Sequence, residues 1–255
     1  MDGSRQFTRR RFGAITGGAF ASALLGTGCD AAGMPQEDAR ILARPRTGVK
    51  TSGNGSRSLG LGASRDAVLH LPPKAAAGPL PLVVLLHGAG NSGAGILRRL
   101  GPFADDAGLV VLSPDSRAST WDAVRGRFGA DVEFIDRALA RVFESVAVDP
   151  HRVSVGGFSD GATYAISLAL QNGDLFRRVL AFSPGFYVGG AAQGKPAFFI
   201  SHGTADQILP IDRCSRVIVP ALKKQGYDVT FRQFDGGHEI PPNVAMAGMS
   251  WVAKR

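Results

Sequence analysis

Residues 152–161 read Arg-Val-Ser-Val-Gly-Gly-Phe-Ser-Asp-Gly, and this stretch decides the fold. A short β-branched run ends in a glycine-rich corner, and Ser159 lies between Gly157 and Gly161. The residues that follow are apolar with helical spacing, so the pattern is strand, G-x-S-x-G, helix, the arrangement that presents a nucleophilic serine on a tight turn. The flanking residues must be small because the two backbones approach closely there. The serine hydroxyl is then expected near the positive end of the helix.

Strand-like and helix-like segments alternate on both sides of this stretch. Residues 82–86, Leu-Val-Val-Leu-Leu, are wholly apolar, as expected for a central parallel strand buried on both faces. The other predicted strands are 67–71, 109–112, 179–182, 197–200 and 229–234, and the predicted helices are 130–146, the segment after Gly161, 212–225 and the segment after Pro242. The alternation predicts an α/β fold with a mostly parallel central sheet and helices on both faces.

Composition agrees with one folded α/β domain. The chain has 255 residues, of which 44% are hydrophobic and 20% charged, enough to bury a sizeable core. The net charge is +8, but four arginines of the first 29 residues contribute to it and the other basic residues are scattered. No helix-turn-helix, zinc-finger or RNP-type signature accompanies the charge, so no nucleic-acid partner is predicted.

A second functional motif follows the buried strand 82–86. The residues His87-Gly88-Ala89-Gly90 form a tight loop ahead of a helix, where backbone N–H groups can bind a developing oxyanion. We expect the two donors to be the N–H of Ala89 and the N–H of Asp160, the residue after the serine. His87 is expected to fix the loop rather than to act as a base.

A serine of ordinary pKa needs a base within reach and a carboxylate that orients the base. Behind an elbow of this kind the chain order is serine, acid, histidine, which leaves His202 and His238 as candidate bases. His202 lies at the end of strand 197–200, only four residues before Asp206, and is poorly placed to reach both groups. His238 follows the last strand on a glycine-rich loop and is the predicted base.

Three aspartates compete for the role of the acid. Asp206 comes just after the strand 197–200, where the order of elements predicts it. Asp212 is expected to cap the next helix, and Asp235 belongs to the loop that carries His238. We therefore predict Asp206, with the other two as rivals.

Four segments carry a family resemblance: 85–90 (Leu-Leu-His-Gly-Ala-Gly), 157–161, 202–210 and 236–240. They resemble the bacterial phospholipase/carboxylesterase group of the α/β-hydrolases, and the elbow with its helix is also similar to polyhydroxyalkanoate-depolymerase-like and feruloyl-esterase-like esterases. The resemblance covers roughly residues 67–253. It implies the α/β-hydrolase fold, with Ser159 as nucleophile, Asp206 as orienting acid and His238 as base.

One residue departs from that family pattern. The family elbow commonly carries Gln or Asn where this chain has Asp160. The backbone N–H survives the change, but a carboxylate beside the nucleophile would disfavour anionic substrates.

The expected activity is that of a serine carboxylesterase that works through an acyl-enzyme and needs no metal or cofactor. Residues 183–196 are too few for a helical lid, so the site is expected to be open to short or medium acyl groups or to the ends of a polymeric ester. Alternatives are a thioesterase or peptidase of the same fold and a non-catalytic, surface-tethered binding module. The aromatic residues expected to line the pocket, or else to pack at the edge of the core, are Trp121, Phe128, Phe186 and Tyr187.

The first 29 residues read as an export signal of a bacterial protein. Thr8-Arg9-Arg10-Arg11-Phe12 precedes a Gly/Ala-rich stretch and resembles a twin-arginine signal. Residues 25–29 end in Cys29 and resemble a lipobox, although Gly26 stands where an apolar residue is usual. The expected location is the periplasm, the cell envelope as a lipoprotein, or the medium, and the only expected membrane contact is a lipid on Cys29.

Residues 30–66 are predicted to be a flexible linker to a domain that spans 67–255. The segment holds Pro35, Pro45 and a polar run over 51–58, and it shows no hydrophobic periodicity.

Overall fold

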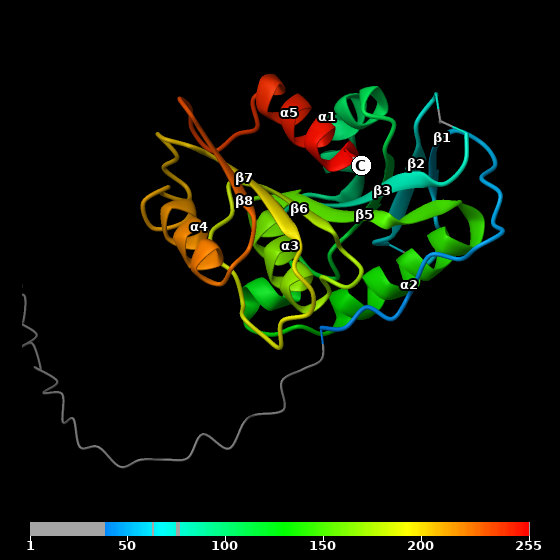
Figure 1. Cartoon of the computed structure of the whole chain (residues 1–255), viewed down its shortest axis with the longest axis horizontal. Coiled ribbons are helices and arrows are strands. Elements are labelled where there is room, and N and C mark those ends of the chain that lie inside the picture. The colour runs from blue at the N-terminus through cyan, green and yellow to red at the C-terminus, as the bar shows by residue number, and fades with distance from the viewer. Residues whose placement is uncertain (1–38, 63, 75–76, 255) are drawn as a thin grey trace, which may run out of the picture. The chain divides into compact units, whose positions relative to one another are not determined.

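The computed structural model describes residues 39–62, 64–74 and 77–254 (Figure 1). The predicted export signal over residues 1–29 and the first part of the predicted linker lie outside these residues.

Eight strands form one sheet in the order β1-β2-β4-β3-β5-β6-β7-β8. The neighbours from β4 to β8 pair in parallel, whereas β2 is antiparallel to both β1 and β4. The predicted mostly parallel sheet is confirmed. The strands are β1 (Gly55–Ser58), β2 (Ala67–Leu71), β3 (Leu80–Leu86), β4 (Val110–Pro114), β5 (Val148–Phe158), β6 (Arg178–Phe182), β7 (Ala197–Gly203) and β8 (Val229–Phe234).

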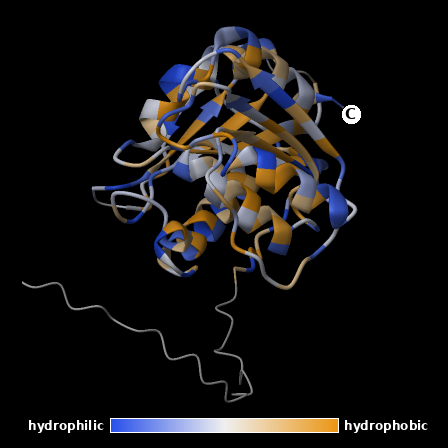
Figure 2. Cartoon of the chain, turned by 90° about the vertical axis from the view of Figure 1, so that its left-hand side faces the viewer, coloured by the Kyte–Doolittle hydropathy of each residue, from blue (hydrophilic) through white to orange (hydrophobic). Residues whose placement is uncertain are grey.

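Helices cover both faces of the sheet, as Figure 1 shows. Side chains alternate across β3: Val83 and Leu85 pack with α1 and α5, and Leu82, Val84 and Leu86 pack on the face that holds α2, α3 and α4. Hydrophobic residues follow the central strands and the inner sides of the helices (Figure 2). The helices are α1 (Gly93–Asp106), α2 (Ala130–Ser145), α3 (Asp160–Gln171), α4 (Ser215–Lys224) and α5 (Pro242–Ala253), with a 3₁₀ turn, η1, at Asp122–Arg125.

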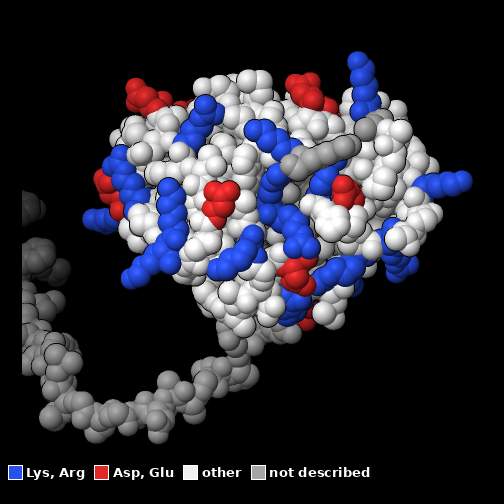
Figure 3. All heavy atoms as spheres, in the orientation of Figure 1, with Lys and Arg blue, Asp and Glu red and all other residues white. Residues whose placement is uncertain are grey.

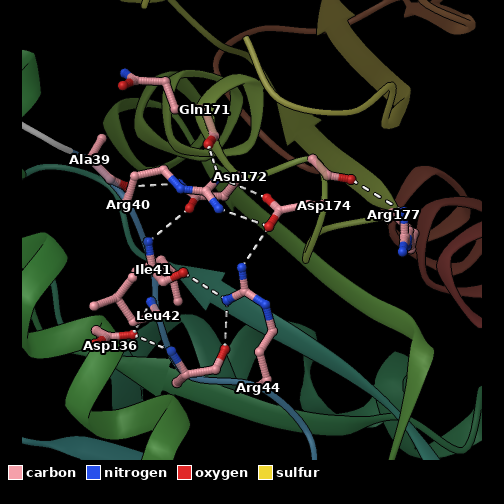
Figure 4. A network of polar contacts seen from close by, with 12 residues as sticks. Ala39, Arg40, Ile41, Leu42, Arg44, Asp136, Gln171, Asn172, Asp174 and Arg177 are labelled. Atoms are coloured by element: carbon pink, nitrogen blue, oxygen red, sulfur yellow. Dashed lines mark hydrogen bonds and ion pairs between the residues drawn. The ribbon is translucent and has the colours of Figure 1, made fainter. Parts of the chain in front are cut away.

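The predicted flexible linker is wrong for the part of it that the structure describes. Ala39 and Ile41 are fully buried, and Asn172 binds the backbone of both: its Nδ2 donates to Ala39 O at 2.7 Å and its Oδ1 accepts from Ile41 N at 2.8 Å. The two terminal guanidinium nitrogens of Arg40 each donate a hydrogen bond of 2.8 Å to the Asp174 carboxylate (Figure 4). Asn172 and Asp174 lie more than 130 residues away in sequence. The sequence of the segment alone therefore could not predict these contacts.

The same segment also extends the sheet. Strand β1 pairs antiparallel with β2 along its whole length, from Gly55 opposite Leu71 to Ser58 opposite Val68. Its residues are mostly exposed, so the strand lacks the apolar pattern from which sequence-based prediction works. The folded domain therefore includes residues 39–62 as well as the predicted range from 67.

Other expectations concern connections and surface. The segment 183–196 between β6 and β7 contains no helix, in agreement with the prediction of no sizeable lid. Within the described ranges, no helix is both long and apolar enough to cross a membrane. On the face seen in Figure 3, basic side chains are spread out with acidic ones among them, as the scattered charges of the sequence suggested.

Candidate active site

Ser159 lies at a sharp turn between β5 and α3. Its backbone has φ 57° and ψ −121°, a conformation that residues other than glycine rarely adopt. A Cβ on Gly157 would lie 2.5 Å from the carbonyl carbon of Gly161, and a Cβ on Gly161 would lie 2.2 Å from Leu86 O. The expected strained turn with small flanking residues is therefore present, at the carboxyl end of the central strand.

His238 and Asp206 meet at the carboxyl ends of the neighbouring strands. His238 Nδ1 lies 2.6 Å from Asp206 Oδ2, and because a carboxylate only accepts, the His238 Nδ1–H donates to it. Asp206 follows β7, and His238 follows β8. This bond leaves Nε2 of the neutral imidazole as an acceptor, which is the state that a general base requires.

Both oxygens of the Asp206 carboxylate accept hydrogen bonds. Its side chain is fully buried, and Oδ1 accepts from the backbone N–H groups of Ile208 at 2.9 Å and Leu209 at 2.8 Å. Burial alone would raise the pKa of Asp206, but the hydrogen bonds from Leu209 and His238 outweigh it and keep the pKa below its usual value. The carboxylate is therefore ionised and fixed in place.

His202 is a neighbour of Asp206, although sequence reasoning considered it only as a rival base. The Ser215 hydroxyl donates to His202 Nδ1 at 2.7 Å, and the His202 Nε2–H donates to Leu209 O at 2.7 Å, with Asp206 Oδ2 at 3.2 Å. The ring is fully buried, and burial lowers its pKa. His202 is thus a neutral group that supports the turn of Asp206. The short spacing of four residues between His202 and Asp206 in the sequence could have predicted that the two side chains lie close together.

The His238 ring lies against the elbow. Its centroid is 4.7 Å from that of Phe158, the residue before Ser159, with the rings inclined by 35°. The ends of β7 and β8 also approach closely, because a Cβ on Gly203 would lie 2.3 Å from Gly237 O. Ser159, Asp206 and His238, predicted from three distant motifs, are therefore gathered at one edge of the sheet.

The loop 87–90 lies on the other side of Ser159. A Cβ on Gly88 would lie 3.4 Å from Ser159 Cβ, so this loop borders the serine side chain. Within the described residues the Ala89 N–H has no backbone acceptor. Asp160 is the first residue of α3, where the N–H has no partner inside the helix. The assignment of these two N–H groups as oxyanion donors stays a prediction.

Asp160 carries a carboxylate next to the elbow. The side chain is half-buried, and Thr120 Oγ1 donates to its Oδ2 at 2.6 Å. This bond ties the first turn of α3 to the loop that follows β4. It also fixes a negative charge close to Ser159.

His87 fixes the loop, as expected. The Ser116 N–H donates to Nε2 at 3.0 Å, so the proton lies on Nδ1, which donates to Gly88 O at 2.8 Å. Burial lowers the pKa of His87 and keeps the ring neutral.

Trp121 does not line a pocket, contrary to prediction. It is fully buried, its Nε1–H donates to His87 O at 2.8 Å, and its ring lies between those of His87 at 5.0 Å and Tyr164 at 5.1 Å. Phe128 is also buried, with its ring 5.4 Å from that of Tyr164. Core packing, the alternative for these aromatic residues, is therefore correct for both.

The two aromatic residues after β6 differ from each other. Phe186 is 45% exposed, and the adjacent Gly185 borders Leu209 in the loop after Asp206, with a Cβ on Gly185 3.4 Å from Leu209 Cδ2. Tyr187 is half-buried, and its hydroxyl accepts from Gln225 Nε2 at 3.0 Å at the end of α4. Phe186 thus lies beside the loop of Asp206, whereas the Tyr187 hydroxyl is engaged with α4.

The rival acids lie elsewhere. Asp212 is exposed and pairs with Arg216 at 2.6 Å instead of capping α4, which begins at Ser215 behind Cys214. Asp235 is exposed as well. In the part of the chain that the structure describes, no group of three or more His, Cys, Asp or Glu is arranged to hold a metal ion.

Comparison with known proteins gives the family. Residues 58–196 match the Esterase family, described as "Putative esterase". The "Putative esterase NocK" of Nocardia uniformis subsp. tsuyamanensis is 31% identical over 180 residues, which are 64% of this chain and 52% of that protein. The S-formylglutathione hydrolase of Bos taurus is 29% identical over 141 residues, 46% of this chain and 50% of that protein. The chain therefore spans about half the length of the curated relatives it matches.

Solved structures agree on the fold. The S-formylglutathione hydrolase FrmB of Staphylococcus aureus superposes with a TM-score of 0.65 at 18% identity, over 80% of this chain and 98% of that one. The carboxylesterase of Bacillus cereus superposes with a TM-score of 0.58 at 21% identity, over 74% and 94%. Because the family match covers more than half of the sequence, the chain belongs to the Esterase family, and the solved esterase structures share its fold.

Proposed function

We propose that the protein hydrolyses carboxylic esters through an acyl-enzyme on Ser159. The observation that carries the proposal is the strained serine at the end of β5 beside a His–Asp pair with a 2.6 Å contact. A strained backbone at a serine costs free energy, about 1–3 kcal/mol, and such strain persists where a function requires it. Membership of the Esterase family supports the same reading.

The proposed reaction has two steps. His238 Nε2 takes the Ser159 proton while Oγ attacks the ester carbonyl, and the alcohol leaves with the proton that the imidazolium returns. Water then attacks the acyl-enzyme by the same route and releases the acid. Asp206 holds the imidazole in the required tautomer and stabilises its charged form.

The N–H groups of Ala89 and Asp160 are the proposed oxyanion donors. Each such donor contributes roughly 3 kcal/mol to transition-state stabilisation when it is preorganised. The rigid loop around His87 and the first turn of α3 supply that preorganisation.

For the substrate we propose a neutral ester with a short or medium acyl group, or the end of a polymeric ester. The connection 183–196 carries no helix that could cover the site, and Phe186 and Ile208 are 45% and 70% exposed near it. The Asp160 carboxylate, fixed by Thr120, would repel an anionic group beside the nucleophile.

Thioester hydrolysis is the second candidate. Two relatives and two structural neighbours are named S-formylglutathione hydrolases, which supports an acyl-sulfur substrate for the same site. The chemistry of Ser159 would be unchanged, with a thiol as the leaving group.

The test is hydrolysis of p-nitrophenyl esters from acetate to palmitate, together with the matching thioesters. We expect turnover that falls with long acyl chains and that drops at least about 10⁴-fold in Ser159→Ala. Ser250→Ala, an exposed serine on α5, is the matched control and should retain full activity. A folded parent that hydrolyses no substrate of the series would refute the esterase proposal and favour the binding module, and a preference for thioesters would select the second candidate.

We also propose that residues 1–29 direct export, with acylation of Cys29. The basic start, the Gly/Ala-rich stretch and the cysteine support it. Fractionation of cells that express an Arg9→Lys/Arg10→Lys variant should find it retained in the cytoplasm, and Cys29→Ser should lose the lipid. An unchanged distribution of the double variant would contradict a twin-arginine route.

A further inference from the structure

A second serine, histidine and aspartate, Ser56, His70 and Asp105, are linked by hydrogen bonds near the β1 edge of the sheet. Ser56 on β1 and His70 on β2 are directly opposite in the antiparallel register, so their side chains share one face of the sheet. Ser56 Oγ is 2.8 Å from His70 Nδ1, and His70 Nε2 is 2.7 Å from Asp105 Oδ1 on α1. Three separate elements thus contribute one residue each.

The chemistry of the three groups fixes the direction of the bonds. The Asp105 carboxylate can only accept, so His70 Nε2 carries a proton and donates it. In the neutral ring Nδ1 is then an acceptor, and the Ser56 hydroxyl donates to it. The serine proton therefore has an acceptor that a carboxylate orients, which is the order of roles found at Ser159, with the imidazole ring reversed.

The three residues open into a cavity of about 340 Å³. Its walls are mainly apolar, with Val68 from β2 and Leu97, Gly101 and Pro102 from one side of α1. Arg98 is the one lining residue with a permanent positive charge. The cavity suits a compact apolar group whose polar end meets the guanidinium.

The position of Asp105 is unfavourable for the helix alone. It lies in the last turn of α1, where negative charge opposes the helix dipole by roughly 0.3–1 kcal/mol and where no basic residue compensates. Departures from such local rules concentrate at functional sites. The cavity runs along α1 from Ala94 to Asp105, and Asp105 lies about 18 Å along the helix from Gly93, which follows the loop that carries Ala89.

We propose that Ser56 is a second acyl-accepting serine, which takes compact apolar acyl groups from activated esters. Ser56 Oγ bonds to the acyl carbon, and its proton passes to His70 Nδ1. The bond between that carbon and the leaving oxygen breaks, and the alcohol departs with the proton that the imidazolium returns. Arg98 donates to the carbonyl oxygen as charge develops there.

The test uses an alkyl fluorophosphonate on the full chain with Ser159→Ala. Ser56 Oγ bonds to phosphorus, fluoride leaves, and the proton passes through His70 to solvent. We expect one adduct on the peptide that contains Ser56, no adduct when Ser56→Ala is added, and labelling about 100-fold slower with His70→Gln. Ser52→Ala, an exposed serine near Ser56, is the matched control and should label at the parent rate. An unlabelled Ser159→Ala protein, or labelling that His70→Gln does not slow, would overturn the proposal.

Asp105→Asn is a second variant that keeps the test decisive if His70→Gln does not fold normally. If thermal unfolding shows that His70→Gln is destabilised, Asp105→Asn decides, since it keeps the size of the side chain. About 10-fold slower labelling supports the proposal, because one orienting charge is lost, and an unchanged rate overturns it. Ester hydrolysis by Ser159 is measured separately in the parent, so failure at one serine is distinguishable from failure at the other.

Discussion

Two His–Asp pairs in this molecule have nearly the same contact distance and different surroundings. His238 and Asp206 meet at 2.6 Å, and His70 and Asp105 at 2.7 Å. The Asp206 side chain is fully buried and accepts two backbone N–H groups, whereas that of Asp105 is 29% exposed. Distance alone therefore does not separate the two pairs, but the support behind the carboxylate does.

Ser159 and Ser56 also differ in how firmly their surroundings hold them. Ser159 has a strained backbone at the start of α3, and its proposed oxyanion donors are backbone N–H groups. Ser56 lies exposed on the edge strand β1, and Arg98 is the residue with a permanent positive charge in the cavity that it borders. Because catalysis depends mainly on preorganised groups, we expect Ser159 to turn over esters and Ser56 only to accept activated groups slowly.

The largest expected effect comes from exchanging the two acids for their amides. Asp206→Asn should lower kcat for p-nitrophenyl acetate about 10⁴-fold, because the amide favours the wrong tautomer of His238. Asp105→Asn should leave that kcat within about twofold, as expected of a site that makes no contact with Ser159. Full activity in Asp206→Asn would remove the difference between the two pairs and reassign the acid to Asp212 or Asp235.

The next effect concerns the strained turn that distinguishes Ser159. Gly161→Ala should lower the free energy of unfolding by about 3 kcal/mol, because its Cβ would lie 2.2 Å from Leu86 O. Gly189→Ala, an exposed position with nothing within 4 Å, should change it by less than about 0.5 kcal/mol. Urea unfolding compares the two, and equal stabilities would show that the turn yields more easily than its packing implies.

Asp174, which pairs with Arg40 and Arg44, is a third carboxylate for the comparison, and we expect its loss to change stability. Hydrogen bonds from Arg40, aided by Arg44 and opposed by burial, hold the pKa of Asp174 well below its ordinary value. A depressed folded-state pKa stabilises the protein fully above the unfolded value, about 3.9, and the contribution disappears as the pH falls through the folded value. Asp174→Asn should therefore cost about 1 kcal/mol at neutral pH, and the difference from the parent should shrink below about pH 4.

Asp212→Asn is the matched control for that experiment. Asp212 pairs with Arg216 but its side chain is 75% exposed, so its loss should change the free energy of unfolding by nothing measurable. Chemical denaturation at a series of pH values tests both variants. A constant difference between Asp174→Asn and the parent down to low pH would contradict the assignment.

Salt gives the smallest effect. Raising the ionic strength from about 0.1 M to about 1 M shortens the Debye length from about 10 Å to about 3 Å. Fluorophosphonate labelling at Ser56 should slow about threefold, because its aspartate is partly exposed and screened, while labelling at Ser159 stays constant. Equal responses at both serines would show that burial of the aspartate does not distinguish the pairs.

The sequence by itself determined the α/β fold and the three residues now grouped at one edge of the sheet. Apolar runs such as 82–86 and the alternation of strands and helices report burial on both faces directly. Small residues around Ser159 report a backbone constraint that holds wherever the turn occurs. The support of Asp206 by His202 was within reach too, since the two are four residues apart.

Only the tertiary structure decided the rest. Trp121 follows a strand as a pocket residue could, but the rings of His87 and Tyr164 enclose it. The segment after residue 38 has the composition of a linker, yet Asn172 and Asp174 fix it to the domain. The second serine cluster joins residues from β1, β2 and α1 that no motif links. Local patterns report what each element buries, whereas contacts between distant segments depend on partners that only the folded chain brings together.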